Sequence, residues 1–177
     1  MSKLILLDRD GVINYDSADY IRCEDDWVPI PGSLEAISTL NQLGHKVAII
    51  TNQSGIARGY FSEQTLEKIH AKLKRCLAEV GGHVDAIFYC PHHPEDDCAC
   101  RKPKANMLKQ AIQQFAIRAQ ESWMVGDSLK DLQAAHNAGC HKVLVKTGNG
   151  LTTLQSQPKL DYQLFDDLSR FVESLQR

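Results

Sequence analysis

The chain has 177 residues and a net charge of −2, and its residues are 43% hydrophobic and 24% charged. These values are ordinary for one globular domain with a sizeable core, and they exclude a disordered or fibrous chain. The sequence has no run of lysine and arginine that would attract nucleic acid or an anionic membrane, and no apolar stretch near the ~20 residues that cross a bilayer.

The first predicted elements are a short strand and a long irregular segment. Leu4–Leu7 is a compact apolar run that ends at an acid, and residues 11–32 are mostly polar without a regular period. The apolar run is too short for the hydrophobic region of a secretory signal. We therefore expect a cytoplasmic protein. A monomer is also expected, with neither a nucleic-acid nor a membrane partner.

Two helices with a strand between them come next. The first helix is predicted from apolar residues at three-residue spacing: Leu34, Ile37, Leu40 and Leu43. Gly44 is expected to end it, and residues 47–50 form a second apolar run that predicts a strand. Ser62 is a candidate cap for the second helix, whose apolar face comprises Leu66, Ile69, Leu73, Leu77 and Val80.

The second half of the chain repeats this alternation. Strands are predicted at residues 86–89, 123–125 and 143–145. The helices that separate and follow them are predicted from three apolar faces: Leu108, Ala111, Ile112 and Phe115; Leu129, Leu132 and Ala135, ended by Gly139; and Leu168, Phe171, Val172 and Leu175.

The predicted fold class is α/β, a three-layer, Rossmann-like parallel sheet with helices on both faces. Strands that are continuous apolar runs between helices are typical of that architecture. One domain over residues 1–177 is expected, with no large cap domain, so residues 11–32 and 90–101 are the candidates for shaping a pocket. Ligands in such sheets bind beyond the carboxyl ends of the strands.

Polar residues in a particular order follow three of the predicted strands. Asp8 and Asp10 follow the first strand, Thr51 the second and Asp127 a later one, while Lys102 lies between the last two. Each residue alone is more often a turn, a cap or a surface residue. Two carboxylates brought together would repel, and magnesium, which prefers oxygen ligands, would relieve that repulsion. The order of these residues therefore indicates one shared phosphate site.

The same residues predict phosphoryl transfer by covalent catalysis. Asp8 would attack phosphorus and form an acyl phosphate, which divides one difficult step into two. Asp10 would protonate the leaving group and then activate water. Thr51 and Lys102 would hold the transferring phosphoryl group.

A second set of candidate metal ligands lies directly before Arg101 and Lys102. Its members are Cys90, His92, His93, Cys98 and Cys100. Three thiolates and one imidazole suit a closed, four-coordinate structural zinc site at about residues 90–100, with no open position for catalysis. Zinc there would brace the loop that presents Arg101 and Lys102. Cysteines without metal in a flexible loop are the alternative.

These motifs resemble those of the haloacid dehalogenase superfamily of phosphotransferases over nearly the whole chain. The resemblance is carried by Asp8-x-Asp10-Gly11, Thr51, Lys102 and Gly126-Asp127-x-x-x-Asp131. It implies that Asp8 is the nucleophile and Asp10 the acid/base. It also implies that magnesium binds Asp8, the backbone carbonyl of Asp10 and Asp127, with Asp131 as a supporting residue.

The cysteine and histidine motif narrows the resemblance to the histidinol-phosphatase-like branch, and it selects His92 rather than His93 as the zinc ligand. The resemblance implies release of the C7 phosphate of a heptose 1,7-bisphosphate, a step toward the heptose of lipopolysaccharide. The implied substrate contacts are Asp16, Ser17, Ala18, Asp19, Thr51, Asn52, Gln53, Ser54, Arg101 and Lys102. Ser128 stands where some relatives carry a lysine, so the chain departs from the family pattern at one contact.

Two other functions are compatible with these residues. A histidinol-phosphate phosphatase would need an acidic partner for the amine of its substrate, which Asp16, Asp19 or residues 24–26 could supply. A zinc-braced binding domain without catalysis is the other alternative, and the intact set of Asp8, Asp10, Lys102 and Asp127 weighs against it.

Overall fold

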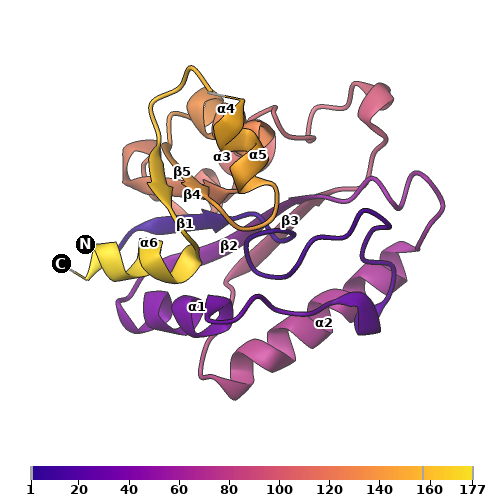
Figure 1. Ribbon diagram of the computed structural model, residues 1–177, viewed down its shortest axis with the longest axis horizontal. Coiled ribbons are helices and arrows are strands. Elements are labelled where there is room, and N and C mark those ends of the chain that lie inside the picture. The colour runs from indigo at the N-terminus through magenta and orange to yellow at the C-terminus, as the bar shows by residue number, and fades with distance from the viewer. Residues whose placement is uncertain (1, 157, 177) are drawn as a thin grey trace.

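A computed structural model of the protein describes residues 2–156 and 158–176. Its centre is a sheet of six strands, all parallel, in the order β3-β2-β1-β4-β5-β6 (Figure 1). The strands are β1 (Leu4–Leu7), β2 (Lys46–Asn52), β3 (Ala86–Cys90), β4 (Ser122–Gly126), β5 (His141–Val145) and β6 (Gln163–Phe165). The outermost positions of the expected domain, Met1 and Arg177, lie outside the described residues.

Helices cover both faces of the sheet, which confirms the predicted fold class (Figure 1). One face carries α1 (Ser33–Gln42), α2 (Glu63–Glu79) and α6 (Leu168–Leu175), and the other carries α3 (Asn106–Phe115), α4 (Leu129–Ala138) and α5 (Gly150–Gln155). Short 3-10 helices lie in three connections: η1 (Glu24–Asp26), η2 (Pro94–Asp96) and η3 (Ala119–Glu121). Over the described ranges, none of the helices has both the length and the apolar character needed to cross a membrane.

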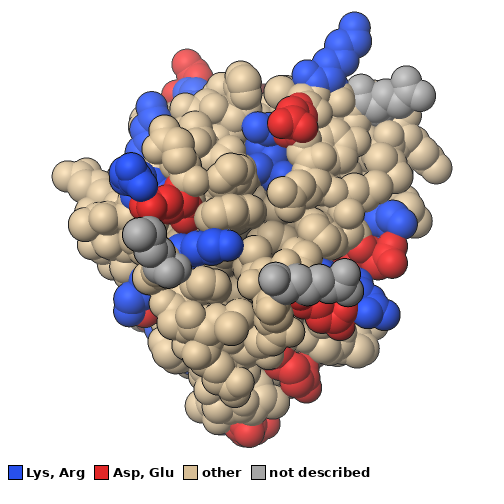
Figure 2. Space-filling view, turned by 90° about the vertical axis from the view of Figure 1, so that its left-hand side faces the viewer, with Lys and Arg blue, Asp and Glu red and all other residues tan. Residues whose placement is uncertain are grey.

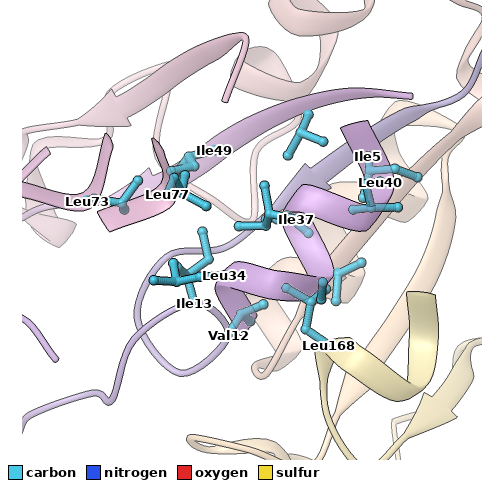
Figure 3. Packing of buried hydrophobic residues seen from close by; sticks show 14 of the residues in the cluster. Ile5, Val12, Ile13, Leu34, Ile37, Leu40, Ile49, Leu73, Leu77 and Leu168 are labelled. Carbon is cyan, nitrogen blue, oxygen red and sulfur yellow. The ribbon is translucent and has the colours of Figure 1, made fainter. Parts of the chain in front are cut away.

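Alternate residues of β1 face opposite layers of the molecule. Ile5 and Leu7 belong to a cluster with residues of α1, α2 and α6, whereas Leu4 and Leu6 pack with residues of α3 and α4. All four side chains are fully buried, which explains why the strand is an unbroken apolar run in the sequence. Figure 3 shows the first cluster, with Ile37 of α1 among the side chains of the sheet and of α2.

Among the α-helices and strands, α5 and β6 were not predicted. The strand β6 has three residues, lies at the edge of the sheet and has no fully buried residue. In α5, only Gly150 and Thr153 are buried. Neither segment therefore has the apolar periodicity from which the other elements were predicted.

Several predicted strands extend one or two residues further in the structure, and two differences in boundary have a clear physical cause. β2 continues through Thr51 and Asn52, which pair with Tyr89 and Cys90 of β3, although their polar side chains end the apolar run. Leu43 lies after the end of α1 and is 40% exposed. An α-helix turns by ~100° per residue, so a residue nine positions after Leu34 would point about 180° away from it. Apolar residues at strict three-residue spacing therefore do not all stay on the buried face.

Candidate active site

An open cleft of about 400 Å³ lies beyond the carboxyl ends of β1, β2 and β4. Its walls include residues of five segments that are distant in the sequence: residues 8–21, 51–54, 101–102, 127–131 and Asn149. Because all strands of the sheet point the same way, the segments that follow them meet at this one edge.

Lys102 is a buried cation at this edge. Its Nζ lies 3.0 Å from Oδ1 of Asp8 and 2.7 Å from Oδ1 of Asp131, and it donates to the carbonyl of Ile50 at 2.8 Å. Burial alone would lower the pKa of Lys102, but the charges of Asp131 and Asp8 outweigh burial and raise it. The ammonium is therefore a fixed positive charge beside Asp8.

Asn52 fixes the backbone that carries Lys102. Its Oδ1 accepts a hydrogen bond from the amide of Lys102 at 3.0 Å, and its Nδ2 donates to the carbonyl of Lys102 at 3.1 Å. Asn52 is also a wall residue of the cleft. The end of β2 thus holds the segment containing Arg101 and Lys102 against the sheet.

Three carboxylates converge at Lys102. Oxygen atoms of Asp8, Asp127 and Asp131 all lie within 4.8 Å of one another. Burial, followed by the charge of Asp131, raises the pKa of Asp8 well above its ordinary value, and the same two causes raise the pKa of Asp127 to about 7. Crowded, partly buried oxygen donors of this kind fit a magnesium ion, whose charge would favour the ionised carboxylates.

The carboxylate of Asp131 is largely engaged by protein donors. Its Oδ2 accepts from the amide of Asp127 at 3.2 Å and from the amide and hydroxyl of Ser128 at 3.0 and 2.8 Å. Its Oδ1 accepts from Lys102, and the side chain is 1% exposed, compared with 14% for Asp8. Asp131 thus caps the start of α4 and orients Lys102.

Two glycines make room for Asp127. Gly11 and Gly148 have φ angles of 85° and 58°, and a Cβ atom at either position would overlap the Asp127 carboxylate. The amide of Asn149 donates to Oδ2 of Asp127 at 2.7 Å, and the hydroxyl of Thr153 donates to the Asp127 carbonyl at 2.8 Å. The position of this carboxylate is therefore set by the connection between β5 and α5.

The carboxylate of Asp10 is held by three side chains. Arg9 Nε and Asn14 Nδ2 each donate to Oδ1 at 2.9 Å, and Gln53 Nε2 donates to Oδ2 at 3.1 Å. Gln53 also donates to the hydroxyl oxygen of Thr51 at 2.9 Å. Since that oxygen already accepts, the hydroxyl proton of Thr51 is available for donation to a ligand in the cleft.

The implied substrate contacts are not all brought to the cleft. Asp16, Ser17 and Ala18 are wall residues, but Asp19 lines a neighbouring hollow with Arg22 and Asp26. The acidic residues 24–26 form η1, and none of them is a wall residue of the cleft. Four wall residues were not predicted: Tyr20, Ile21, Lys130 and Asn149. None of them belongs to a strand-end motif. Lys130 lies near Asp127 in the sequence, and Tyr20 directly follows the implied contact Asp19.

Arg101 is a cation of the cleft wall that has capacity left for a ligand. Its Nη1 is buried and has no hydrogen-bond partner among the described residues. Lys130 also lines the cleft, and burial followed by the charge of Arg101 lowers its pKa. A nearby anion would stabilise both cations.

The cysteine and histidine residues of the loop after β3 form a compact cluster. Ligand atoms of Cys90, His92, Cys98 and Cys100 lie within 4.8 Å of one another, with Nδ1 of His92 3.2 Å from Sγ of Cys100. His93 is not part of the cluster, because its Nδ1 accepts from the amide of Glu95 at the start of η2. A set of three sulfur atoms and one imidazole nitrogen fits tetrahedral zinc.

Comparisons with known proteins extend these observations. A family model described as haloacid dehalogenase-like hydrolase matches residues 3–139. A D-glycero-beta-D-manno-heptose-1,7-bisphosphate 7-phosphatase from Pseudomonas aeruginosa is 51% identical over 172 residues, which cover 97% of each chain. An enzyme of the same name from Neisseria meningitidis serogroup A is 46% identical, over 97% of this chain and 93% of the relative.

A solved structure is similar over nearly the full length. It is a D,D-heptose 1,7-bisphosphate phosphatase from Bordetella bronchiseptica, complexed with magnesium and phosphate. It superposes with a TM-score of 0.95 and is 49% identical. The match covers 98% of each chain.

Proposed function

The chain belongs to the haloacid dehalogenase-like hydrolase family, and from that membership we propose that it is a magnesium-dependent phosphatase with Asp8 as its nucleophile. The observation that carries this proposal is the convergence of Asp8, Asp127 and Lys102 at one edge of the sheet. The magnesium and phosphate in the similar structure from Bordetella bronchiseptica support the same cofactor and ligand chemistry.

In the proposed first step, a carboxylate oxygen of Asp8 forms a bond to phosphorus while the bond to the ester oxygen breaks. Asp10 gives its proton to the leaving oxygen. The ammonium of Lys102 and the hydroxyl of Thr51 stabilise the charge on the transferring group. In the second step, Asp10 takes a proton from water, the water oxygen attacks phosphorus, and inorganic phosphate leaves Asp8 as a free carboxylate.

The cofactor would be held by Asp8, Asp127 and the backbone carbonyl of Asp10. When bound, magnesium supplies positive charge that neutralises the phosphoryl oxygens. The raised pKa values of Asp8 and Asp127 support this assignment, because the charge of Lys102 alone does not offset burial and the repulsion between the carboxylates. Asp131 would support the site through Lys102 rather than as a ligand.

As substrate we propose a heptose 1,7-bisphosphate that loses its C7 phosphate. Relatives at 51% and 46% identity carry that name, and the chain covers nearly all of their length. The residues proposed to contact the sugar phosphate are those of the cleft wall at 16–18, 51–54 and 101–102. Asp19 is omitted, because it lines the neighbouring hollow.

A structural zinc site is proposed at Cys90, His92, Cys98 and Cys100. The cluster immediately precedes Arg101 and Lys102 in the chain, so zinc would brace the loop that carries both cations. Thiolate ligands persist in a reducing compartment, which supports the expected cytoplasmic location.

The test is the substitution Asp8→Asn, which keeps the size of the side chain and removes the nucleophile. Phosphate release from the heptose bisphosphate in the presence of magnesium should fall to background, while circular dichroism and the melting temperature stay close to those of the wild type. The control is Asp161→Asn at an exposed position, which should keep full activity. Turnover by Asp8→Asn at the rate of the wild type would rule out this nucleophile.

The same assay distinguishes the alternative substrate. Asp16 lines the cleft and could face the amine of histidinol phosphate, so both esters should be compared at steady state. We expect the larger kcat/KM for the heptose bisphosphate. A larger value for histidinol phosphate would reverse the assignment of substrate without affecting that of Asp8.

A further inference from the structure

Arg9 is a fully buried guanidinium directly beside the proposed acid/base residue. It is 0% exposed, and its Nε and Nη2 donate to the two carboxylate oxygens of Asp10 at 2.9 and 3.2 Å. Its third nitrogen, Nη1, lies 3.2 Å from Nε2 of His70. A side chain of α2 is therefore connected to Asp10 through a single residue.

The direction of the contact between Arg9 and His70 follows from chemistry. A guanidinium can only donate, so Nε2 of His70 must accept and the ring must carry its proton on Nδ1. Burial, followed by the charge of Arg9, lowers the pKa of His70 to about 3, which keeps the ring neutral near pH 7. Near neutral pH, the lone pair of Nε2 is therefore available to accept the hydrogen bond from Arg9.

Loss of this acceptor would change the environment of Asp10. Nη1 of Arg9 would keep a buried N–H group without a partner, and the guanidinium would gain by rotating toward another acceptor. That rotation would weaken the bidentate hydrogen bonding of Arg9 to the carboxylate of Asp10. A group that transfers protons works only while it is held in reach of the reacting oxygen, so small displacements reduce the rate.

We propose that His70 is a positioning residue for the reaction, which holds Arg9 in the orientation that fixes the carboxylate of Asp10. The inference rests on the proposed function, because it concerns the step that Asp10 assists. His70 does not line the cleft and is not expected to touch substrate.

The other surroundings of His70 provide a control. The ring lies at a hollow with Glu67, Lys74 and Tyr89, and it meets the ring of Tyr89 edge to face at 6.4 Å between centroids. Tyr89 therefore contacts His70 without taking part in the chain of hydrogen bonds to Asp10. Tyr89→Phe should leave kcat unchanged.

The experiment compares His70→Leu with His70→Gln. The leucine keeps apolar volume and removes the acceptor, whereas the amide oxygen of glutamine can take the place of Nε2. For the heptose bisphosphate with saturating magnesium, His70→Leu should lower kcat on the order of tenfold to a hundredfold, with KM within about twofold. His70→Gln should recover kcat to within about threefold of the wild type.

Two results would overturn the proposal. One is an equal kcat for the wild type and both variants, and the other is an equal loss in both variants that follows their melting temperatures. A second measurement is the ¹⁵N spectrum of the His70 ring near pH 7. A proton on Nδ1 is the expected result, and a proton on Nε2 would exclude the chain of hydrogen bonds, with or without turnover. Absence of turnover in the wild type would instead refute the proposed function, and the ring spectrum would still decide the contact with Arg9.

Discussion

Lys102 is the residue on which the charge balance of the site depends. It lies between Asp8 and Asp131 with 2% of its side chain exposed, so its ammonium offsets carboxylates that water cannot screen. Lys104, two residues after Lys102, forms an ion pair with Asp97. This pair is at the surface, with side chains 45% and 93% exposed. The two lysines therefore form a matched pair for comparing a buried with an exposed interaction.

Replacement of Lys102 by methionine should destabilise the fold as well as stop turnover. In magnesium-free buffer we expect the free energy of unfolding to fall by about 3 kcal/mol or more, because a buried carboxylate loses its partner. Lys104→Met should change it by less than about 1 kcal/mol, since exposed pairs contribute little. Urea unfolding measures both variants, and equal stabilities for the two would contradict the role assigned to Lys102.

The sequence predicted site residues that directly follow a strand or belong to a motif between two such strand ends. Asp8, Asp127 and Lys102 belong to motifs whose order alone indicated a shared site, and the structure places them together. Asn149 could not be predicted, because its contact with Asp127 depends on the path of the chain after β5. Asp19 illustrates the reverse case, since its place three residues from Asp16 does not bring it to the same hollow.

The connection between β5 and α5 contributes to the proposed magnesium site through its contacts with Asp127. Gly148 has a φ of 58°, and a methyl group there would meet both the carboxylate of Asp127 and the backbone of Gly11. Gly44 has a similar φ of 77°, but an added methyl group would find no atom within 4 Å. An alanine at either position would therefore be strained by the positive φ, but of these two positions only Gly148 would also bring the methyl group against Asp127.

Gly148→Ala should weaken magnesium binding, because Asp127 must move to make room. We expect the affinity, measured by calorimetric titration, to fall about tenfold, which corresponds to about 1.4 kcal/mol. Gly44→Ala should cost about 1 kcal/mol of stability from its backbone alone and leave the affinity unchanged. An unchanged affinity in Gly148→Ala would show that the site tolerates the displacement.

The loop after β3 should depend on zinc for its structure. Metal analysis of the wild type should find about one equivalent of zinc per chain, as expected for a closed structural site. Cys98→Ser should lower that content and reduce phosphate release, because Arg101 and Lys102 follow the cluster directly, while Cys76→Ser in α2 should keep the metal. A stable wild type without zinc would contradict the proposal.

The elements themselves were predictable where they are buried. β1 and α2 gave clear patterns because each contributes fully buried apolar side chains. α5 and β6 gave no such pattern, because few of their residues are buried. Their positions depend on contacts with the rest of the fold. β2 extends through Thr51 for a similar reason, because its last residues are held by pairing with β3 and not by burial of apolar side chains.

For the molecule as a whole, the parallel sheet is what makes the site. It brings the segments after β1, β2, β4 and β5 to one edge, with the cores of both layers behind them. Charges of both signs are interspersed on the face shown in Figure 2, without a field of one sign. The cleft also combines both signs, because Arg101, Lys102 and Lys130 lie there among five aspartates, and its cations suit a small phosphate ester.

Trapping the phosphorylated enzyme tests directly whether Asp8 is the nucleophile. Wild-type protein mixed with the heptose bisphosphate and magnesium should be quenched in acid within one turnover, digested and analysed by mass spectrometry. We expect an acid-stable, base-labile phosphate on the peptide that contains Asp8, and no phosphate there when magnesium is omitted. Rapid turnover with no phosphate on that peptide, or with phosphate on a different residue, would contradict it.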